Sequence, residues 1–103
     1  MKQLSILWLL LVSVNALANS SNSETLDTDE GFPYKNVIMR ADRVELNYAM
    51  QDDKVECSIK VQSTELSKPY VGETQLVSKK QFRKTPMQAC LTRPVAKALL
   101  AQL

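Results

Sequence analysis

Residues 43–62 read RVELNYAMQDDKVECSIKVQ, and this stretch decides the fold. Apolar and polar side chains alternate along 43–50 and again along 55–62, which is the pattern of β-strands that bury one face. The two runs are joined around Asp52-Asp53, a pair that favours turns. The stretch therefore predicts an antiparallel β-hairpin.

The expected register of this hairpin gives favourable cross-strand pairs on both of its faces. With the two aspartates as the loop, Tyr48 faces Cys57, and the large apolar residues of one strand meet apolar residues of the other. On the opposite face Glu45 faces Lys60, and a cross-strand pair of opposite charge contributes roughly 0.2–1 kcal/mol. Burial and charge therefore specify the same register.

Two further stretches predict additional strands. Residues 36–41 alternate in the same way, with a one-residue phase shift before Arg43 that indicates a β-bulge or a break between strands. A helix through this region is the alternative, and the clean alternation after Arg43 argues against it. Residues 74–78 fit either a third strand or the start of a short helix, which Ser78 would cap with Gln81 in the capping-box position.

The C-terminal segment predicts two short helices. The run Thr85-Pro86-Met87-Gln88 combines an N-cap residue, a proline at N1 and a glutamine at N3, which favours a helix over 86–92. Pro94 is poorly tolerated inside a helix, so we expect a kink or a restart there and a helix over 94–102. The apolar residues of this last segment recur on one helical face: Val95, Ala96, Leu99, Leu100 and Leu103. Short helices on one face of a small antiparallel sheet define an α+β fold.

Cys57 and Cys90 predict one disulfide. Cys57 belongs to the apolar face of the hairpin and Cys90 to the apolar face of the first C-terminal helix, so a bond would join helix to sheet. Closing a loop of this length stabilises a domain by roughly 3–4 kcal/mol in the chain-entropy model. Free thiols or a redox pair are the alternative, but the spacing is far from a CxxC motif.

Residues 1–18 have the layout of a cleavable export signal. Lys2 supplies the positive n-region, 4–14 form an apolar h-region, and 16–18 place small residues before a cut at Asn19. The apolar run is well short of the roughly 20 residues that span a bilayer, although an uncleaved anchor is the alternative. We therefore expect a periplasmic or secreted bacterial protein, exported by a Sec-type route, with no stable membrane span after cleavage.

The rest of the chain divides into an arm and one domain. Residues 19–31 are polar and acidic, with Leu26 as their only large apolar residue, so we expect a flexible arm before a single globular domain at 32–103. Charge is also uneven: 19–56 hold nine acidic and four basic residues, and 57–103 hold two acidic and eight basic. Such a split either marks a partner surface or is neutralised between the halves in the fold.

The residue set excludes the most familiar catalytic groups. The chain contains no histidine, which removes Ser-His-Asp and Cys-His systems and histidine-containing zinc sites. Paired carboxylates stay formally available for hydrolysis, but Asp52-Asp53 fits a turn better and Glu45 fits a partner of Lys60. We therefore predict no catalytic residue, no metal and no cofactor.

The candidate binding site is a dense basic cluster. It consists of Lys79, Lys80, Arg83 and Lys84 around Phe82, and such a cluster suits an anionic partner. The alternative is a solvated face around one buried aromatic ring. Nucleic acid is a poor partner for an exported chain that has no nucleic-acid motif.

Together these patterns favour an exported, non-enzymatic binding protein. An inhibitor, an immunity protein and an accessory factor of envelope assembly all fit, and the expected partner is another protein of the cell envelope. A small-ligand carrier and a small carboxylate-dependent enzyme are the alternatives.

Overall fold

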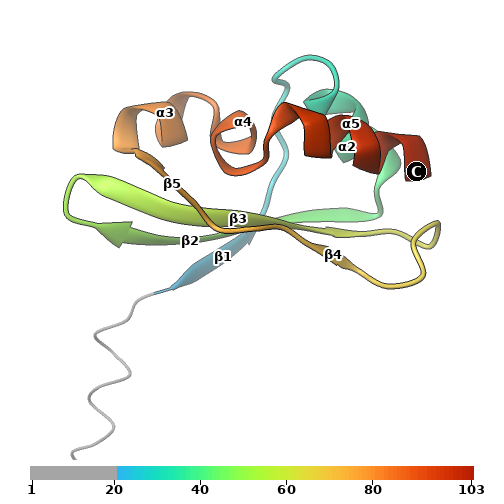
Figure 1. Ribbon diagram of the computed structural model, residues 1–103, viewed down its shortest axis with the longest axis horizontal. Coiled ribbons are helices and arrows are strands. Elements are labelled where there is room, and N and C mark those ends of the chain that lie inside the picture. The colour runs from blue at the N-terminus through green and yellow to red at the C-terminus, as the bar shows by residue number, and fades with distance from the viewer. Residues whose placement is uncertain (1–20) are drawn as a thin grey trace, which may run out of the picture.

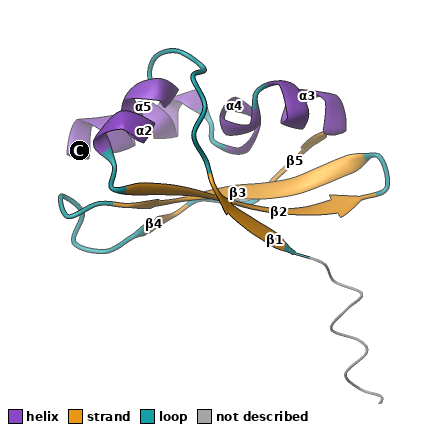
Figure 2. Ribbon diagram, turned by 180° about the vertical axis from the view of Figure 1, so that it is seen from behind, coloured by secondary structure: helices purple, strands orange, loops and turns teal. Residues whose placement is uncertain are grey.

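One five-stranded antiparallel sheet carries the described helices on a single face (Figure 1). The computed structural model describes residues 21–103, so the predicted export signal at 1–18 lies outside the described residues. The strands are β1 (Asn22–Thr25), β2 (Arg43–Gln51), β3 (Lys54–Gln62), β4 (Tyr70–Val71) and β5 (Gln75–Ser78). The helices are α2 (Tyr34–Arg40), α3 (Lys79–Lys84), α4 (Pro86–Cys90) and α5 (Arg93–Gln102). The reverse view shows the same two layers, which confirm the predicted α+β fold (Figure 2).

The β2–β3 hairpin forms in the predicted register. Tyr48 pairs with Cys57 and Glu45 with Lys60. Asp52 occupies the turn with a φ of 46°, a left-handed conformation that aspartate tolerates better than most residues. The alternation of the sequence therefore places one apolar row under the helices and leaves a mixed polar row on the uncovered face.

Strand β3 is flanked on one side by β2 and on the other by β4 and β5 in succession. β4 pairs near Val61, β5 pairs near Cys57, and the N–H of Gly72 bridges the gap by donating to the carbonyl of Ile59 at 2.9 Å. A Cβ at Gly72 would lie 3.1 Å from that carbonyl oxygen, which explains the glycine at this close approach.

The region around Ser78 contains both structures that its sequence allowed. Strand β5 ends at Ser78, and the Ser78 hydroxyl then accepts a hydrogen bond from the N–H of Gln81 at 3.1 Å. The predicted strand at 74–78 and the predicted N-cap are therefore both confirmed, because the same residue ends one element and begins the next.

The predicted strand at 36–41 is wrong, because this segment is helix α2. Its buried and half-buried apolar residues fall at i, i+3, i+4 and i+7, which is the helical period. They are Tyr34, Val37, Ile38 and Ala41. The alternating stretch that begins at residue 36 is too short to distinguish the period of a strand from that of a helix. It also begins after Tyr34, which is only 4% exposed.

The segment 19–31, expected to be a flexible arm, contains strand β1. β1 pairs with β2 although all four of its side chains are exposed, because ladder formation uses backbone groups and needs no apolar side chain. The N–H of Leu26 donates to the carbonyl of Val44 at 2.8 Å, and the Leu26 side chain is buried. Residues 22–26 therefore add a strand and a core residue to the domain.

The C-terminal helices close the core between the layers. α4 ends at Cys90, two residues before the predicted end, and α5 restarts after Thr92 as Pro94 required. The predicted disulfide is present: the Cys57–Cys90 bond joins β3 to α4 with an S–S distance of 2.03 Å. Both sulfurs belong to the buried core, so the bond fixes the helix layer over the centre of the sheet.

Candidate functional site: the cationic helix α3

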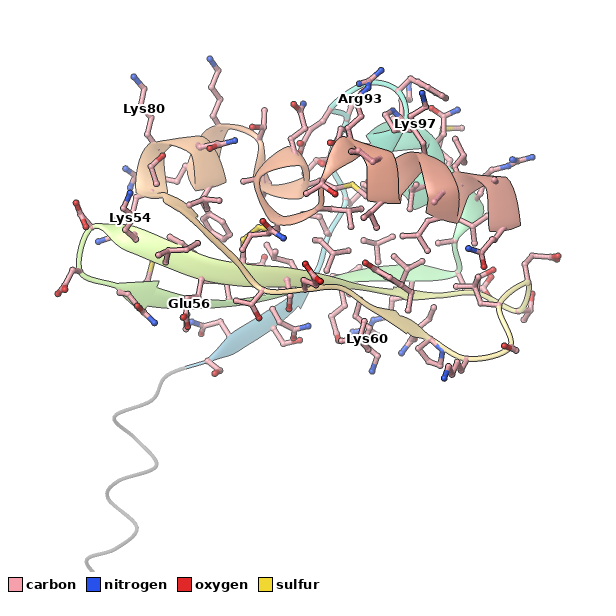
Figure 3. All side chains as sticks on the ribbon, viewed as in Figure 1. Lys54, Glu56, Lys60, Lys80, Arg93 and Lys97 are labelled. Atoms are coloured by element: carbon pink, nitrogen blue, oxygen red, sulfur yellow. A yellow bond between two sulfur atoms is a disulfide. The ribbon has the colours of Figure 1, made fainter. Side chains whose placement is uncertain are left out.

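Helix α3 presents the four predicted basic residues around one buried aromatic anchor. The Phe82 side chain is 8% exposed, and its ring centroid lies 5.0 Å from that of Tyr48 on β2. Lys80, Arg83 and Lys84 are exposed and Lys79 is half-buried. Lys80 projects away from the sheet (Figure 3). The anchor therefore holds the basic cluster on the outside of the helix layer.

These four cations form no ion pair within residues 21–103. The ion pairs found there join Lys35 to Asp29 and Arg43 to Glu45, each at 3.4 Å. Both pairs connect residues of the acidic N-terminal half. The predicted neutralisation between the two halves is therefore not achieved by ion pairing.

The arrangement of α3 is electrostatically unfavourable for the helix itself. Lys79 and Arg83 are four residues apart, as are Lys80 and Lys84, and like charges at this spacing destabilise a helix by roughly 0.2–0.5 kcal/mol per pair. Lys79 and Lys80 also occupy the first turn, where the helix dipole favours anions. Only Arg83 and Lys84, in the last turn, have the favourable position.

Charge is segregated by type of element across the described chain. The four helices contain no acidic residue, whereas all described aspartates and glutamates lie in strands or loops. The helical basic residues are Lys35, Arg40, Lys79, Lys80, Arg83, Lys84, Arg93 and Lys97. Figure 3 shows Lys80, Arg93 and Lys97 on the helix layer, with Glu56 and Lys60 on the uncovered sheet face.

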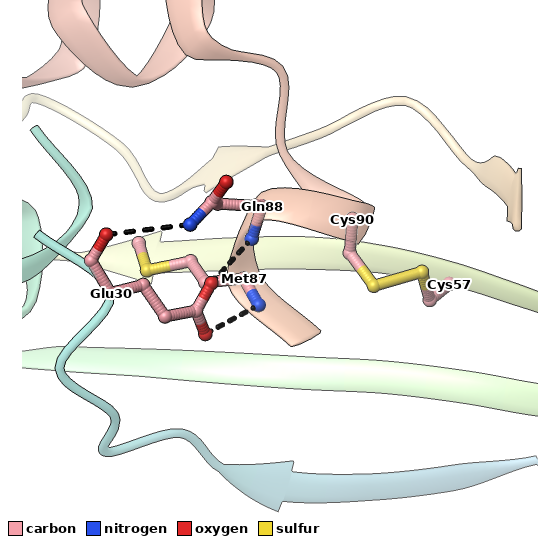
Figure 4. The surroundings of a disulfide bond; sticks show 5 residues. All are labelled: Glu30, Cys57, Met87, Gln88 and Cys90. Carbon is pink, nitrogen blue, oxygen red and sulfur yellow. Dashed lines mark hydrogen bonds between the residues drawn. A yellow bond between two sulfur atoms is a disulfide. The ribbon is translucent and has the colours of Figure 1, made fainter. Parts of the chain in front are cut away.

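An acidic side chain of the loop after β1 compensates the helix layer at the first turn of α4. The Glu30 carboxylate accepts hydrogen bonds from the backbone N–H groups of Met87, at 3.0 Å, and Gln88, at 2.9 Å (Figure 4). The Thr28 hydroxyl donates to the same carboxylate at 2.8 Å. Sequence reasoning assigned this capping role to Thr85, whose side chain makes no cap hydrogen bond. Glu30, which lies 57 positions before Met87, does so instead, and local sequence carries no sign of it.

Two tyrosines packed in or against the core have a shifted pKa. Burial, together with the hydrogen bond and charge of the Glu24 carboxylate, raises the pKa of the Tyr48 hydroxyl. Burial likewise raises the pKa of Tyr34, with Arg93 opposing the shift. Within residues 21–103 no three acidic, cysteine or histidine side chains gather in a way that would hold a metal ion. None of the helices in this range is both long enough and apolar enough to cross a membrane.

The fold and the site were compared with known proteins. No protein-family model, no curated protein and no solved structure matches this chain.

Proposed function

We propose that this chain is an exported, non-enzymatic protein that binds an acidic protein of the cell envelope through helix α3. The observation that carries the proposal is the set of four cations on α3 that form no ion pair within residues 21–103 and that include two like-charge pairs four residues apart. A cluster that destabilises its own helix is easier to explain by contact with another molecule than by a role in folding.

Export is part of the proposal because it accounts for the disulfide. Disulfides persist in oxidising compartments and are rare in the bacterial cytoplasm. The Cys57–Cys90 bond is the covalent tie between the two layers, and residues 1–18 have the layout of an export signal. The periplasm and the cell exterior both satisfy these two requirements.

The structural roles of the acidic side chains favour binding over carboxylate catalysis. Glu30 caps α4, Asp29 pairs with Lys35, and Glu45 pairs with Arg43. Asp52 holds the left-handed position of the hairpin turn. A general acid–base pair needs carboxylates that face a substrate cleft, and these four face structural partners or solvent.

Two charge-matched variants test the proposal. The first converts Lys79, Lys80, Arg83 and Lys84 to Gln, and the second converts Arg40, Lys60, Lys68 and Lys97 to Gln. Each variant lowers the net charge by the same amount, and none of these residues takes part in an ion pair of the described chain. The measurement is quantitative cross-linking of the purified proteins to an extract of the cell envelope.

We expect the wild type and the second variant to cross-link the same acidic proteins to an equal extent. The first variant should no longer cross-link them. Rising salt should weaken the same contacts, because exposed charges are screened over about 10 Å at 0.1 M ionic strength. Equal cross-linking by all three proteins would reject α3 as the binding surface.

A further inference from the structure

The strand beside the cationic helix has a free outer edge. Within residues 21–103, β5 pairs only with β3, and no backbone hydrogen bond outside the ladders involves 75–78. The β4–β5 margin faces the viewer in Figure 1, with α4 and α5 above it. An edge of this kind offers a row of N–H and C=O groups to an incoming strand.

Both faces beside this edge offer contacts for alternate side chains. On the helix side a hollow of about 170 Å³ is lined by Tyr70 and Gln75 of the sheet and by Leu91 and Val95 of the helix layer. On the uncovered face Leu76 is 59% exposed. A strand added to β5 would direct every second side chain toward the hollow and the others toward Leu76.

Charge distinguishes this edge from the opposite margin of the sheet. β5 leads directly from Ser78 into the four cations of α3. The other margin, β1, is exposed and polar, carries Glu24 and is followed by Asp27. An acidic segment is therefore attracted to β5 and repelled from β1.

We propose that the β4–β5 edge binds an extended acidic segment of the partner protein by strand addition, which rests on the proposed function of α3. Main-chain hydrogen bonds to β5 supply affinity, and the hollow accepts one side chain of the added strand. The cations of α3 select acidic residues at the Ser78 end. Glu73 also lines the hollow and disfavours acidic residues at the other end.

A synthetic peptide tests strand addition directly. The probe is an eight-residue fluorescent peptide of four consecutive valines and four consecutive glutamates, so that valines reach both faces of β5 and the glutamates can lie at the Ser78 end, and fluorescence anisotropy gives its affinity for the purified full-length protein. Two analogues carry N-methyl groups, one on every odd-numbered residue and the other on every even-numbered residue. Since only one set of N–H groups in a strand can face β5, one analogue should bind at least about tenfold more weakly and the other should bind like the parent peptide.

Two protein variants and one exchange measurement complete the test. Leu76→Thr should weaken binding of the parent peptide several-fold, and Met39→Thr, which alters another exposed apolar residue, on α2, should have no effect. Amide exchange at 75–78 should slow when the peptide binds, whereas exchange at 22–25 should not change.

The outcomes separate this inference from the proposed function. Peptide binding that depends on the cations of α3 but is equal for both N-methylated analogues would overturn strand addition. The proposed role of α3 as a binding surface would still hold. No binding of the peptide at millimolar concentration would also overturn strand addition. Slower exchange at 22–25 in place of 75–78 would show that the peptide binds at β1, and this result would also overturn the inference.

Discussion

The carboxylate of Glu30 accepts a hydrogen bond from the N–H of Met87 at 3.0 Å, although the two residues are 57 positions apart. The same carboxylate binds the N–H of Gln88, so one acidic side chain satisfies two free donors of α4. This contact ties the loop after β1 to the helix that carries Cys90 (Figure 4). The position of α4 is therefore set from both ends, by Glu30 and by the disulfide.

Removing the Glu30 carboxylate should destabilise the domain. Glu30→Ala leaves the N–H groups of Met87 and Gln88 without their acceptor, and we expect a loss of about 1–3 kcal/mol in the free energy of unfolding. Glu30→Gln keeps one acceptor oxygen and should lose less. Urea unfolding measures both, with Glu65→Ala on an exposed loop as the control. Equal stability of Glu30→Ala and the control would mean that the cap contributes nothing.

Removing the disulfide should also lower stability, and the losses caused by the two single substitutions should not add in the double variant. Cys57→Ala and Cys90→Ala each open the same closed loop, so each should cost about 2–5 kcal/mol. The double variant should unfold close to either single variant, because one bond is absent in all three. Thermal unfolding under oxidising conditions checks this. Melting temperatures equal to that of the wild type would contradict it.

Substitutions at the two aspartates of the hairpin turn should have different effects on stability. Asp52 has a φ of 46° and is the only described residue other than glycine with a positive φ. Asp52→Val forces a β-branched side chain into this conformation and should destabilise by about 1–2 kcal/mol, whereas Asp52→Asn should be nearly neutral. The control is Asp53→Val, at the neighbouring turn position. Similar losses for both valine variants would show that the backbone conformation at Asp52 is not the cause.

Stability should fall in alkaline solution because of the tyrosines. Burial raises the pKa of Tyr34 above the value of about 10 that it has when unfolded. The unfolded chain therefore loses this proton first, and the free energy of unfolding declines as pH rises through and above 10. Urea unfolding between pH 8 and 11, at about one-unit steps, should give a shallower decline for Tyr34→Phe than for the wild type. Parallel curves would exclude Tyr34 as the source.

What the sequence predicted depended on how local each pattern was. The β2–β3 register followed from residues within one hairpin, and the Ser78 cap from four consecutive residues. By contrast, β1 is held by backbone groups of a distant strand and Glu30 caps a helix far along the chain, so neither has a local pattern. The basic cluster was visible as a composition, but only the fold shows that its cations form no ion pair within residues 21–103 and that β5 ends beside them.

The central claim is that α3 keeps its cations for binding at the expense of stability. The direct measurement compares urea unfolding and cross-linking for the variant with Lys79, Lys80, Arg83 and Lys84 converted to Gln. Relief of two like-charge pairs predicts a free energy of unfolding that is unchanged or higher by up to about 1 kcal/mol, together with loss of the acidic partners. A variant that is clearly less stable, or one that still captures those partners, would contradict the claim.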